Sequence, residues 1–397
     1  MEGRGLTKVL ITWELGGGLG HLTPIRTLAG KLLDRGHEVC LAVRDLVSAG
    51  SLFEGLPVSY YQSPHRIEPF RPEIDPPVTY EHMLHNIGFG TEPGLNALSS
   101  AWVQIFEHCK PDAVLFEHSP VAMFAARAYG FRKAVTGTGF TVPPTPLPLI
   151  RPWMRSDESG LQAGRRRTLS MVNAVAGRFG NPPLGDLSEV YGDADVFLRT
   201  YPELDHFGRR QAACYVGIDV DDNGKKPQWP YGDGPKIFAY LKPFQGFQDA
   251  ILKIHRLKLP TIVFCPGLRK EDVVNLETAY PSMLFSTELL CMNHVAVHCD
   301  VAVCHGGHGM VARMLIAGVP VVAIPLQLEQ TLLSQRLAES GAGIQLAIKD
   351  VSQLGEAINH ILANEKYYQN AGRMSEAYFD EAKQGSWQRI AEWVDES

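Results

Sequence analysis

The chain has 397 residues, of which 45% are hydrophobic and 20% charged, and its formal net charge is -6. This length suits two domains of roughly 150 to 200 residues, each large enough to bury its own core. Ordinary globular composition argues against long disordered tails, and the negative charge argues against a nucleic-acid partner, which needs a concentrated basic surface.

The cysteines and the hydropathy predict the cellular compartment of the protein. Seven cysteines are scattered without a CxxC pair, and several fall within apolar segments. We therefore expect reduced, buried thiols and a cytoplasmic protein. No stretch approaches the roughly 18 consecutive apolar residues of a membrane span, and the N-terminus lacks the layout of a signal peptide, so we expect no integral membrane segment.

Short apolar runs alternate with amphipathic segments in the first half of the chain. We predict strands at 9–13, 38–43, 113–116, 134–136 and 196–199, and helices at 22–33 and 121–129. This alternation predicts a parallel α/β sheet. Two interruptions rich in proline and aromatic residues, 63–94 and 143–153, either line a pocket or pack as loops.

A change of composition divides the chain. Residues 219–235 concentrate Asp, Asn, Gly, Lys and Pro, which predicts a linker between domains 1–218 and 236–380. The second half again alternates, with predicted strands at 236–241, 261–265, 283–285, 301–304 and 321–324, and predicted helices at 246–257 and 311–317. It too should form a parallel sheet. Helical spacing of apolar residues at 386–394 predicts a last helix.

A glycine-rich loop, ELGGGLGH, follows the first strand and precedes the first helix. Gly18 and Gly20 would let a ligand approach the backbone closely. Together with Asp45 after the second strand, the loop could also be a dinucleotide fingerprint of a dehydrogenase. Against this alternative, the spacing is GxGxG instead of GxGxxG, and His21 stands where close helix packing favours a small residue.

A second glycine turn, HGGHGM, runs from His305 to Met310 between a buried strand and a helix. Such a turn leaves unpaired N–H groups and the positive end of the helix dipole facing a ligand, which suits a diphosphate. The chain then forms another strand and turns at Pro325 toward Gln327, Glu329 and Gln330. Carboxylate and amide groups at that position suit sugar hydroxyls.

The run from HGGHGM to GVPVVAIPLQLEQ resembles the donor-binding signature of the UDP-glycosyltransferase superfamily. Its members have the GT-B fold, two Rossmann-like α/β domains that face each other across a cleft, and move a sugar from a nucleoside diphosphate to an acceptor. The resemblance implies an acceptor-binding first domain, a donor-binding second domain and a last segment, 381–397, that crosses back to the first domain.

His21 with Leu22, Thr23 and Pro24 resembles the GHxxP element of the same family, whose histidine deprotonates the acceptor hydroxyl. An imidazole titrates near neutral pH, which suits this role. A carboxylate would orient it, and Glu117 stands where the family commonly has an aspartate. Asp112 is the second candidate for that carboxylate, and His118 is a further possible participant.

The resemblance also implies a donor site, with the diphosphate held by backbone amides and no metal ion or cofactor. Two positions depart from the family pattern: Arg313 replaces a ribose-binding glutamate, and residues 289–292 replace the usual base-binding segment. The donor-binding candidates are Gly18, Gly20, Lys242, Met292, His305, Gly306, Gly307, His308, Gly309, Met310, Arg313, Gln327, Glu329 and Gln330.

We therefore expect an inverting glycosyltransferase that uses a UDP- or dTDP-sugar, with a small molecule, lipid or glycan as acceptor. Two alternatives stay open. Nucleotide-sugar 2-epimerases use a related fold and need no acceptor, and a nucleotide-sugar-binding protein would show no turnover.

Overall fold

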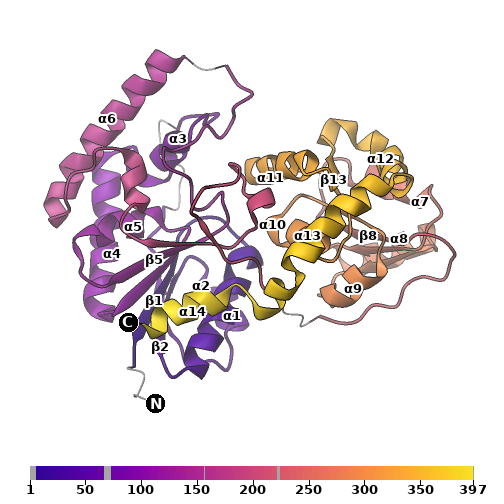
Figure 1. Ribbon diagram of the computed structural model, residues 1–397, viewed down its shortest axis with the longest axis horizontal. Helices are drawn as coiled ribbons and strands as arrows, with labels where there is room; N and C mark the ends of the chain where they lie inside the picture. Colours follow the sequence, from indigo (N-terminus) through magenta and orange to yellow (C-terminus); the bar gives the residue numbers. More distant parts are fainter. Residues whose placement is uncertain (1–5, 67–72, 156, 221–223, 397) are drawn as a thin grey trace. The chain divides into compact units, whose positions relative to one another are not determined.

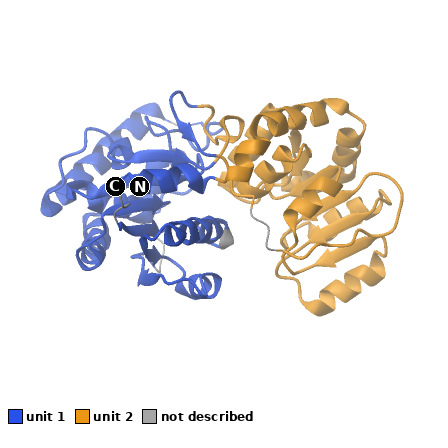
Figure 2. Ribbon diagram, turned by 60° about the horizontal axis from the view of Figure 1, so that its bottom comes forward, with its two compact units in different colours: residues 1–199, 210–216, 386–397 blue, residues 200–209, 217–385 orange. Residues whose placement is uncertain are grey.

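The computed structural model describes residues 6–66, 73–155, 157–220 and 224–396. The chain divides into two compact units (Figure 2). Unit 1 comprises residues 1–199, 210–216 and 386–397, and unit 2 comprises residues 200–209 and 217–385. Residues 221–223 of the predicted linker and residues 67–72 of the first predicted interruption lie outside the described residues.

Unit 1 is built on a seven-stranded parallel sheet with the order β3-β2-β1-β4-β5-β6-β7. Its strands are β1 (Lys8–Trp13), β2 (Glu38–Val43), β3 (Ser59–Gln62), β4 (Ala113–Glu117), β5 (Arg132–Gly137), β6 (Asp195–Leu198) and β7 (Cys214–Tyr215). The central strands β1 and β4 are almost entirely buried, as their continuous apolar sequences predict for a sheet covered on both faces. The parallel sheet expected for this half is confirmed.

The helices of unit 1 cover its sheet in two groups, which Figure 1 shows. They are α1 (Leu19–Asp34), α2 (Leu46–Leu52), α3 (Tyr80–Leu84), α4 (Glu92–Cys109), α5 (Pro120–Ala125), α6 (Glu158–Ala176) and α14 (Trp387–Asp395). Alternate residues of β1, Val9, Ile11 and Trp13, pack with α1, α2 and α14 in one hydrophobic cluster. Helix α4 contacts both α5 and α6.

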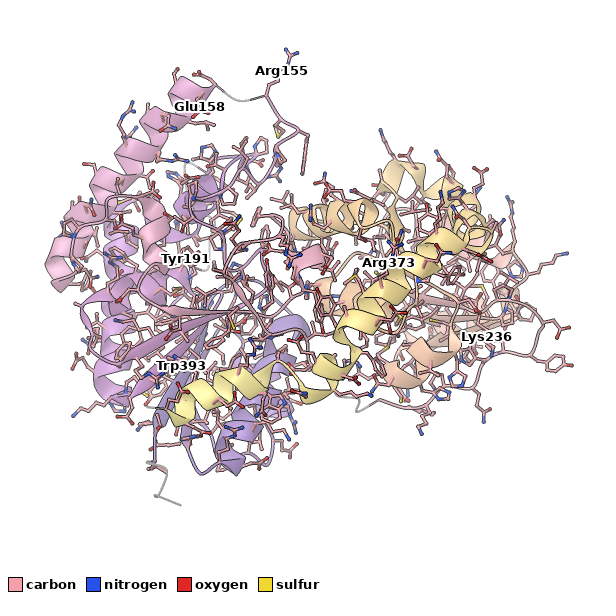
Figure 3. All side chains as sticks on the ribbon, in the orientation of Figure 1. Arg155, Glu158, Tyr191, Lys236, Arg373 and Trp393 are labelled. Carbon is pink, nitrogen blue, oxygen red and sulfur yellow. The ribbon has the colours of Figure 1, made fainter. Side chains whose placement is uncertain are left out.

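Helix α14 returns from the far end of the sequence to unit 1. Its Trp393, labelled in Figure 3, donates from Nε1 to Asp195 Oδ2 at 2.7 Å. The Arg132 guanidinium lies 4.3 Å from the centre of the same indole ring. These contacts attach α14 to the start of β5 and β6, so the last helix is an integral part of this unit.

Unit 2 is built on a six-stranded parallel sheet with the order β10-β9-β8-β11-β12-β13. Its strands are β8 (Ile237–Tyr240), β9 (Thr261–Phe264), β10 (Met283–Ser286), β11 (Val301–Cys304), β12 (Val321–Ala323) and β13 (Gly343–Gln345). Its helices are α7 (Phe247–His255), α8 (Lys270–Ala279), α9 (Met292–His298), α10 (His308–Ile316), α11 (Leu328–Glu339), α12 (Leu354–Leu362) and α13 (Glu365–Gln384). One face of the sheet packs with α9, α10, α11 and α13, and the other with α7 and α12.

The two predicted interruptions of unit 1 lie side by side. Thr79 forms an isolated antiparallel bridge with Leu149, and Ile150 N donates to Val78 O at 2.8 Å. The first interruption also contains α3 and the start of α4, which the sequence analysis did not predict. The predicted helix 121–129 is α-helical only over α5 and ends in a 3₁₀ turn, Ala126–Ala128.

No described helix is both long enough and apolar enough to cross a lipid bilayer.

Candidate active site

His21 and Glu117 meet at the carboxyl edge of the unit 1 sheet. Glu117 is the last residue of β4, and His21 lies in the first turn of α1, just after the loop that leaves β1. His21 Nδ1 is 3.0 Å from Glu117 Oε1. The Glu117 side chain is only 4% exposed, whereas that of His21 is 15% exposed. The structure thus brings together the two residues that the sequence analysis chose as base and orienting acid.

This geometry defines the state of the imidazole. A carboxylate at Nδ1 favours the tautomer in which Nδ1–H donates to Glu117, and Nε2 then carries the lone pair. Nε2 can take a proton from a hydroxyl placed beside it, and the carboxylate stabilises the resulting imidazolium. The pair therefore has the arrangement of a general base with its orienting acid.

Arg199 contacts the same carboxylate and was not selected from the sequence. Its Nη1 is 3.6 Å from Glu117 Oε2, on the other oxygen from the one that faces His21. Arg199 follows β6 directly, and its backbone N–H donates to Gly137 O at 2.8 Å. A charged residue at the end of the predicted strand 196–199 was the sequence signal that could have indicated it.

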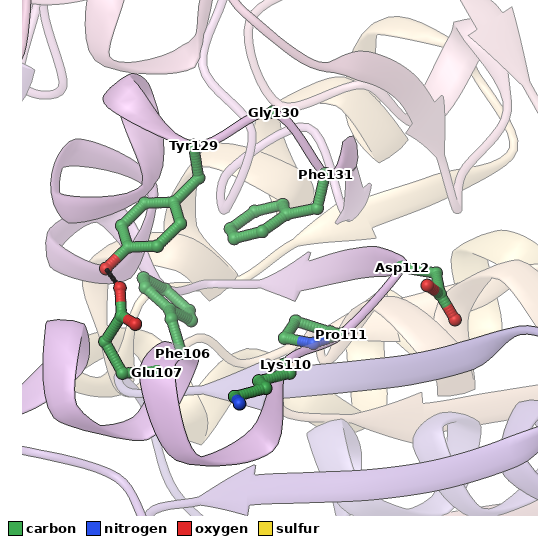
Figure 4. Close-up of a pocket in the computed structure, with 8 residues that line it drawn as sticks. All are labelled: Phe106, Glu107, Lys110, Pro111, Asp112, Tyr129, Gly130 and Phe131. Atoms are coloured by element: carbon green, nitrogen blue, oxygen red, sulfur yellow. Dashed lines mark hydrogen bonds between the residues drawn. The ribbon is translucent and has the colours of Figure 1, made fainter.

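Asp112, the second candidate for the carboxylate, lies at the opposite end of β4. A five-residue strand separates it from Glu117 by about 16 Å, and its Oδ2 accepts a hydrogen bond from Lys8 N at 2.7 Å. Asp112 therefore cannot orient His21, and that alternative is wrong. It lines instead an open pocket of about 430 Å³ formed by Phe106, Glu107, Lys110, Pro111, Asp112, Tyr129, Gly130 and Phe131 (Figure 4).

The glycine loop of unit 1 lies against the His21 ring. Gly16 has a φ of 83° and Gly18 a φ of 78°, so both adopt a conformation that other residues rarely tolerate. Gly18 is the N-cap of α1, and Gly20 is exposed within its first turn. Asp45, which the dinucleotide alternative requires, caps α2 by accepting from Ser48 N at 3.0 Å.

We predict that Gly16→Ala impairs catalysis through His21. A Cβ at residue 16 would overlap Nε2 of His21, so the imidazole would have to move away from Glu117. We expect kcat/KM for the sugar transfer predicted from the sequence to fall by about 10- to 100-fold, because a small displacement of a catalytic group has effects of that order. Gly17→Ala is the matched control, since a Cβ there meets nothing within 4 Å. Equal rates for the two variants would contradict the prediction.

Glu14 is a buried carboxyl group beside this site. Its oxygens accept hydrogen bonds from Val121 N at 3.1 Å and Ala122 N at 2.5 Å, at the start of α5. Burial raises the pKa of Glu14 to about 8, although the two N–H donors oppose that shift. The folded protein thus keeps a proton on Glu14 at pH values where the unfolded chain, with a pKa near 4.5, releases it.

We predict that this carboxyl group makes stability depend on pH. Because its pKa is raised by folding, its contribution to the free energy of unfolding is greatest below about pH 4.5 and is lost as the pH rises through about 8. Urea unfolding between pH 5 and 8.5 should show a decline in the wild type that Glu14→Gln lacks. A wild-type stability that rises relative to Glu14→Gln over this range would show that the N–H donors dominate.

The second glycine turn opens α10 in unit 2. Gly306 has a φ of 74°, and Gly307 is the N-cap of α10 without any side-chain cap. The helix therefore directs backbone N–H groups and the positive end of its dipole out of its first turn. Gly309 is exposed there and Met310 is partly buried. This is the geometry expected of an anion site at a helix N-terminus.

His305 is held by the backbone of its own unit. Its Nε2 accepts from Lys242 N at 3.0 Å, and its Nδ1 lies 3.0 Å from Ile324 O, so Nδ1–H donates there. Burial is the main cause that lowers the pKa of His305, which keeps the ring neutral. His305 thereby joins the loops that follow β8 and β12. Its predicted contact with a diphosphate stays a prediction, because these bonds already use both ring nitrogens.

His308 makes a contact that the sequence analysis did not foresee. Its Nε2 lies 2.7 Å from Thr200 Oγ1, and its ring stacks on His206 with centroids 6.0 Å apart. His206 Nε2 is in turn 3.9 Å from Glu329 Oε1. Thr200 and His206 therefore connect the glycine turn to the first turn of α11. No motif in the sequence marked either residue.

The polar residues predicted for sugar binding lie at the start of α11. Gln327 is its exposed N-cap, and Glu329 is in its first turn. Gln330 reaches the loop before the helix, where its Oε1 accepts from Leu326 N at 2.8 Å. Gln327 and Glu329 thus stand together after the end of β12, whereas the Gln330 side chain is bonded to the loop that precedes α11.

The remaining donor-binding candidates are spread over unit 2. Arg313 donates to Asp219 O at 3.1 Å, Val220 O at 3.3 Å and Asn293 Oδ1 at 3.2 Å. Arg313 therefore links residues 219–220 to α9. Its role toward a ribose or phosphate stays a prediction. Met292 begins α9, and the Lys242 side chain is exposed. Among the described residues, no group of three or more His, Cys, Asp or Glu side chains could hold a metal ion.

Comparisons with known sequences identify relatives of this chain. Residues 262–392 match the family model of the erythromycin biosynthesis protein CIII-like C-terminal domain. A PGL/p-HBAD biosynthesis glycosyltransferase of Mycobacterium tuberculosis is 28% identical over 217 residues, which are 52% of this chain and 50% of that protein. The chain thus spans about half the length of the first curated relatives it matches. A zeaxanthin glucosyltransferase of Pseudescherichia vulneris is 23% identical over 387 residues, 88% of this chain and 89% of that protein.

Solved structures show the same fold. The calicheamicin glycosyltransferase CalG4 superposes with a TM-score of 0.70 at 17% identity, over 98% of both chains. The glycosyltransferase VinC in complex with dTDP superposes with a TM-score of 0.67 at 16% identity, over 97% of this chain and 99% of that one. The fold is therefore GT-B, as expected. The names of the matching family and of the sequence relatives, rather than those of the solved structures, favour a transferase over the isomerase and the binding protein.

Proposed function

Because this chain belongs to the UDP-glycosyltransferase superfamily, we propose that it transfers a sugar from a nucleoside diphosphate to an acceptor hydroxyl, with inversion and without a metal ion. The observation that carries the proposal is the His21–Glu117 pair, with Nδ1 and Oε1 3.0 Å apart. A base of this kind is needed to remove a proton from a hydroxyl as that oxygen attacks the anomeric carbon.

The reaction proceeds as one displacement. The acceptor hydroxyl gives its proton to His21 Nε2 while its oxygen forms the new bond to the anomeric carbon. The bond from that carbon to the diphosphate oxygen breaks, and its electron pair leaves with the diphosphate. Backbone amides of Gly307 to Gly309 and the α10 dipole stabilise this charge, which is why the proposal needs no metal ion. One displacement at the carbon inverts its configuration.

The donor is a UDP- or dTDP-sugar in this proposal, and dTDP in the VinC structure supports a pyrimidine nucleotide. We further propose an acceptor hydroxyl on an apolar molecule. The segment 143–153 of unit 1 exposes Leu149 and Trp153, which are 45% and 50% accessible. The zeaxanthin glucosyltransferase among the relatives is named for an apolar acceptor.

The proposal is tested by a matrix of donors and acceptors with the purified full-length chain. UDP- and dTDP-sugars are combined with carotenoid, phenolic, sterol and glycan hydroxyls, and nucleoside diphosphate release is measured together with the mass of the glycoside. We expect acceptor-dependent release, a product of inverted anomeric configuration by NMR, and equal rates with and without EDTA. Conversion of a sugar nucleotide without acceptor would indicate an isomerase, and tight donor binding without turnover would indicate a binding protein.

A further inference from the structure

His21 has two flat rings as neighbours, both nearly parallel to its imidazole. The Trp13 ring centre lies 5.5 Å from that of His21, with 24° between the ring planes. The His118 ring centre lies 5.8 Å away, with 28° between the planes. We call these three residues the ring stack. The proposed base role of His21 uses neither Trp13 nor His118.

Both neighbours are held firmly by their surroundings. Trp13 ends β1 and is 1% exposed, and its Nε1 donates to Leu15 O at 2.6 Å. Leu15 N in turn donates to His118 O at 3.2 Å, which ties the loops after β1 and β4 together. His118 is 8% exposed, has a φ of 44° and also contacts the Phe140 ring edge. Rings fixed in this way can fix the plane of the imidazole beside them.

The stack can hold one positive charge at most. Burial, and then the charge of His21, lower the pKa of His118 to about 3, while the Leu15 backbone opposes the shift. His118 therefore stays neutral whenever the protein works near neutral pH. Three other charged or titratable side chains belong to this region: Glu117 contacts His21 Nδ1, Arg199 lies on the far oxygen of Glu117, and Glu14 is bonded to the start of α5.

Neutral aromatic faces attract a cation within about 6 Å of the ring centre, and the attraction is strongest for Trp. Both ring distances fall within that limit. When His21 accepts a proton it becomes a cation beside the Trp13 indole and the neutral His118 imidazole. The same contacts stabilise the neutral form of His21 much less. The stack therefore favours the state that His21 reaches as the acceptor loses its proton.

We propose that Trp13 and His118 are positioning residues that fix the ring plane of His21 and stabilise its protonated form. The inference rests on the proposed function, because protonation of His21 matters only if it acts as the base. It assigns a purpose to two residues, one at the end of β1 and one directly after β4, that the displacement itself does not require.

The test is a proton NMR titration of His21 Cε1–H in the full-length protein without substrate, with the signal assigned by its loss in His21→Gln. Trp13→Leu and His118→Leu should each lower the midpoint by about half a pH unit, because a stabilised imidazolium loses its proton at higher pH. They should also lower kcat about threefold and move the acid limb of its pH profile downward, with the donor KM unchanged. Trp13→Phe and His118→Phe, which keep a flat ring, should restore the midpoint.

Phe131→Leu is the matched control, because Phe131 is an aromatic residue at the opposite edge of the same sheet. Midpoints in Trp13→Leu and His118→Leu equal to that of the wild type would overturn the inference. If Trp13→Leu fails to fold, His118→Leu and His118→Phe decide the question. Midpoint shifts in a protein that transfers no sugar would instead leave the stack in place and refute the proposed function.

Discussion

Replacement of His21 by Ala should lower kcat/KM for sugar transfer by about 10²- to 10⁴-fold, which is the usual contribution of a general base. The acceptor hydroxyl would then have to lose its proton to water, while donor binding in unit 2 would be unaffected. Initial rates at saturating donor measure the loss, and calorimetric titration with the nucleoside diphosphate measures the unchanged affinity.

Two variants make this result specific. Glu117→Gln keeps a hydrogen-bonding side chain of the same length beside Nδ1 but removes the charge that stabilises the imidazolium, so we expect an intermediate loss of kcat. His108→Ala, at the exposed end of α4, is the control and should retain the wild-type rate. Near-normal turnover of His21→Ala would remove His21 from the base role.

Replacement of Gly306 by Ala should both destabilise unit 2 and weaken donor binding. A Cβ at this residue would overlap Ser334 Oγ and lie 3.2 Å from Gln330 O, both on α11. Its φ of 74° adds strain for any residue with a side chain. Together these effects should lower the free energy of unfolding by about 2 kcal/mol or more, since strain and overpacking each cost on the order of 1 to 3 kcal/mol.

Urea unfolding without ligand measures the stability loss, and calorimetry with UDP and dTDP measures the affinity. Gly309→Ala is the matched control for stability, because its φ is ordinary and a Cβ there meets nothing within 4 Å. The prediction fails if both variants unfold at the same urea concentration. It also fails if Gly306→Ala binds the nucleotides as tightly as the wild type does.

The sequence predicted the central strands well because they are continuous apolar runs. Strands β2 and β11 have the expected bounds, and the expected ranges of β1 and β4 each differ by one residue at one end. The edge strands β3, β7 and β13 were missed. The residues of β3 are mostly exposed, and β7 and β13 have only two and three residues, so none has the apolar run that identifies a buried strand.

Among the helices, too, those without a clear apolar pattern were missed. A proline-rich segment obscured the start of α4, whose N-cap Thr91 accepts from Gly94 N at 3.3 Å. Helix α6 was missed because its sequence is largely polar and only a few of its residues are buried. Such a helix is stabilised by packing one narrow face against its neighbours, which a search for apolar periodicity detects poorly.

The sequence by itself determined the two parallel α/β halves and both glycine turns, and it favoured Glu117 over Asp112 as the carboxylate beside His21. It could do so because parallel strands end at one edge of a sheet, and each of these features follows a strand. Only the tertiary structure decided that Arg199 lies 3.6 Å from the second oxygen of Glu117, that Trp13 and His118 flank His21, and that backbone groups occupy both nitrogens of His305. Those contacts join residues that are distant in the chain, and their side-chain distances depend on how helices and strands pack rather than on any local pattern.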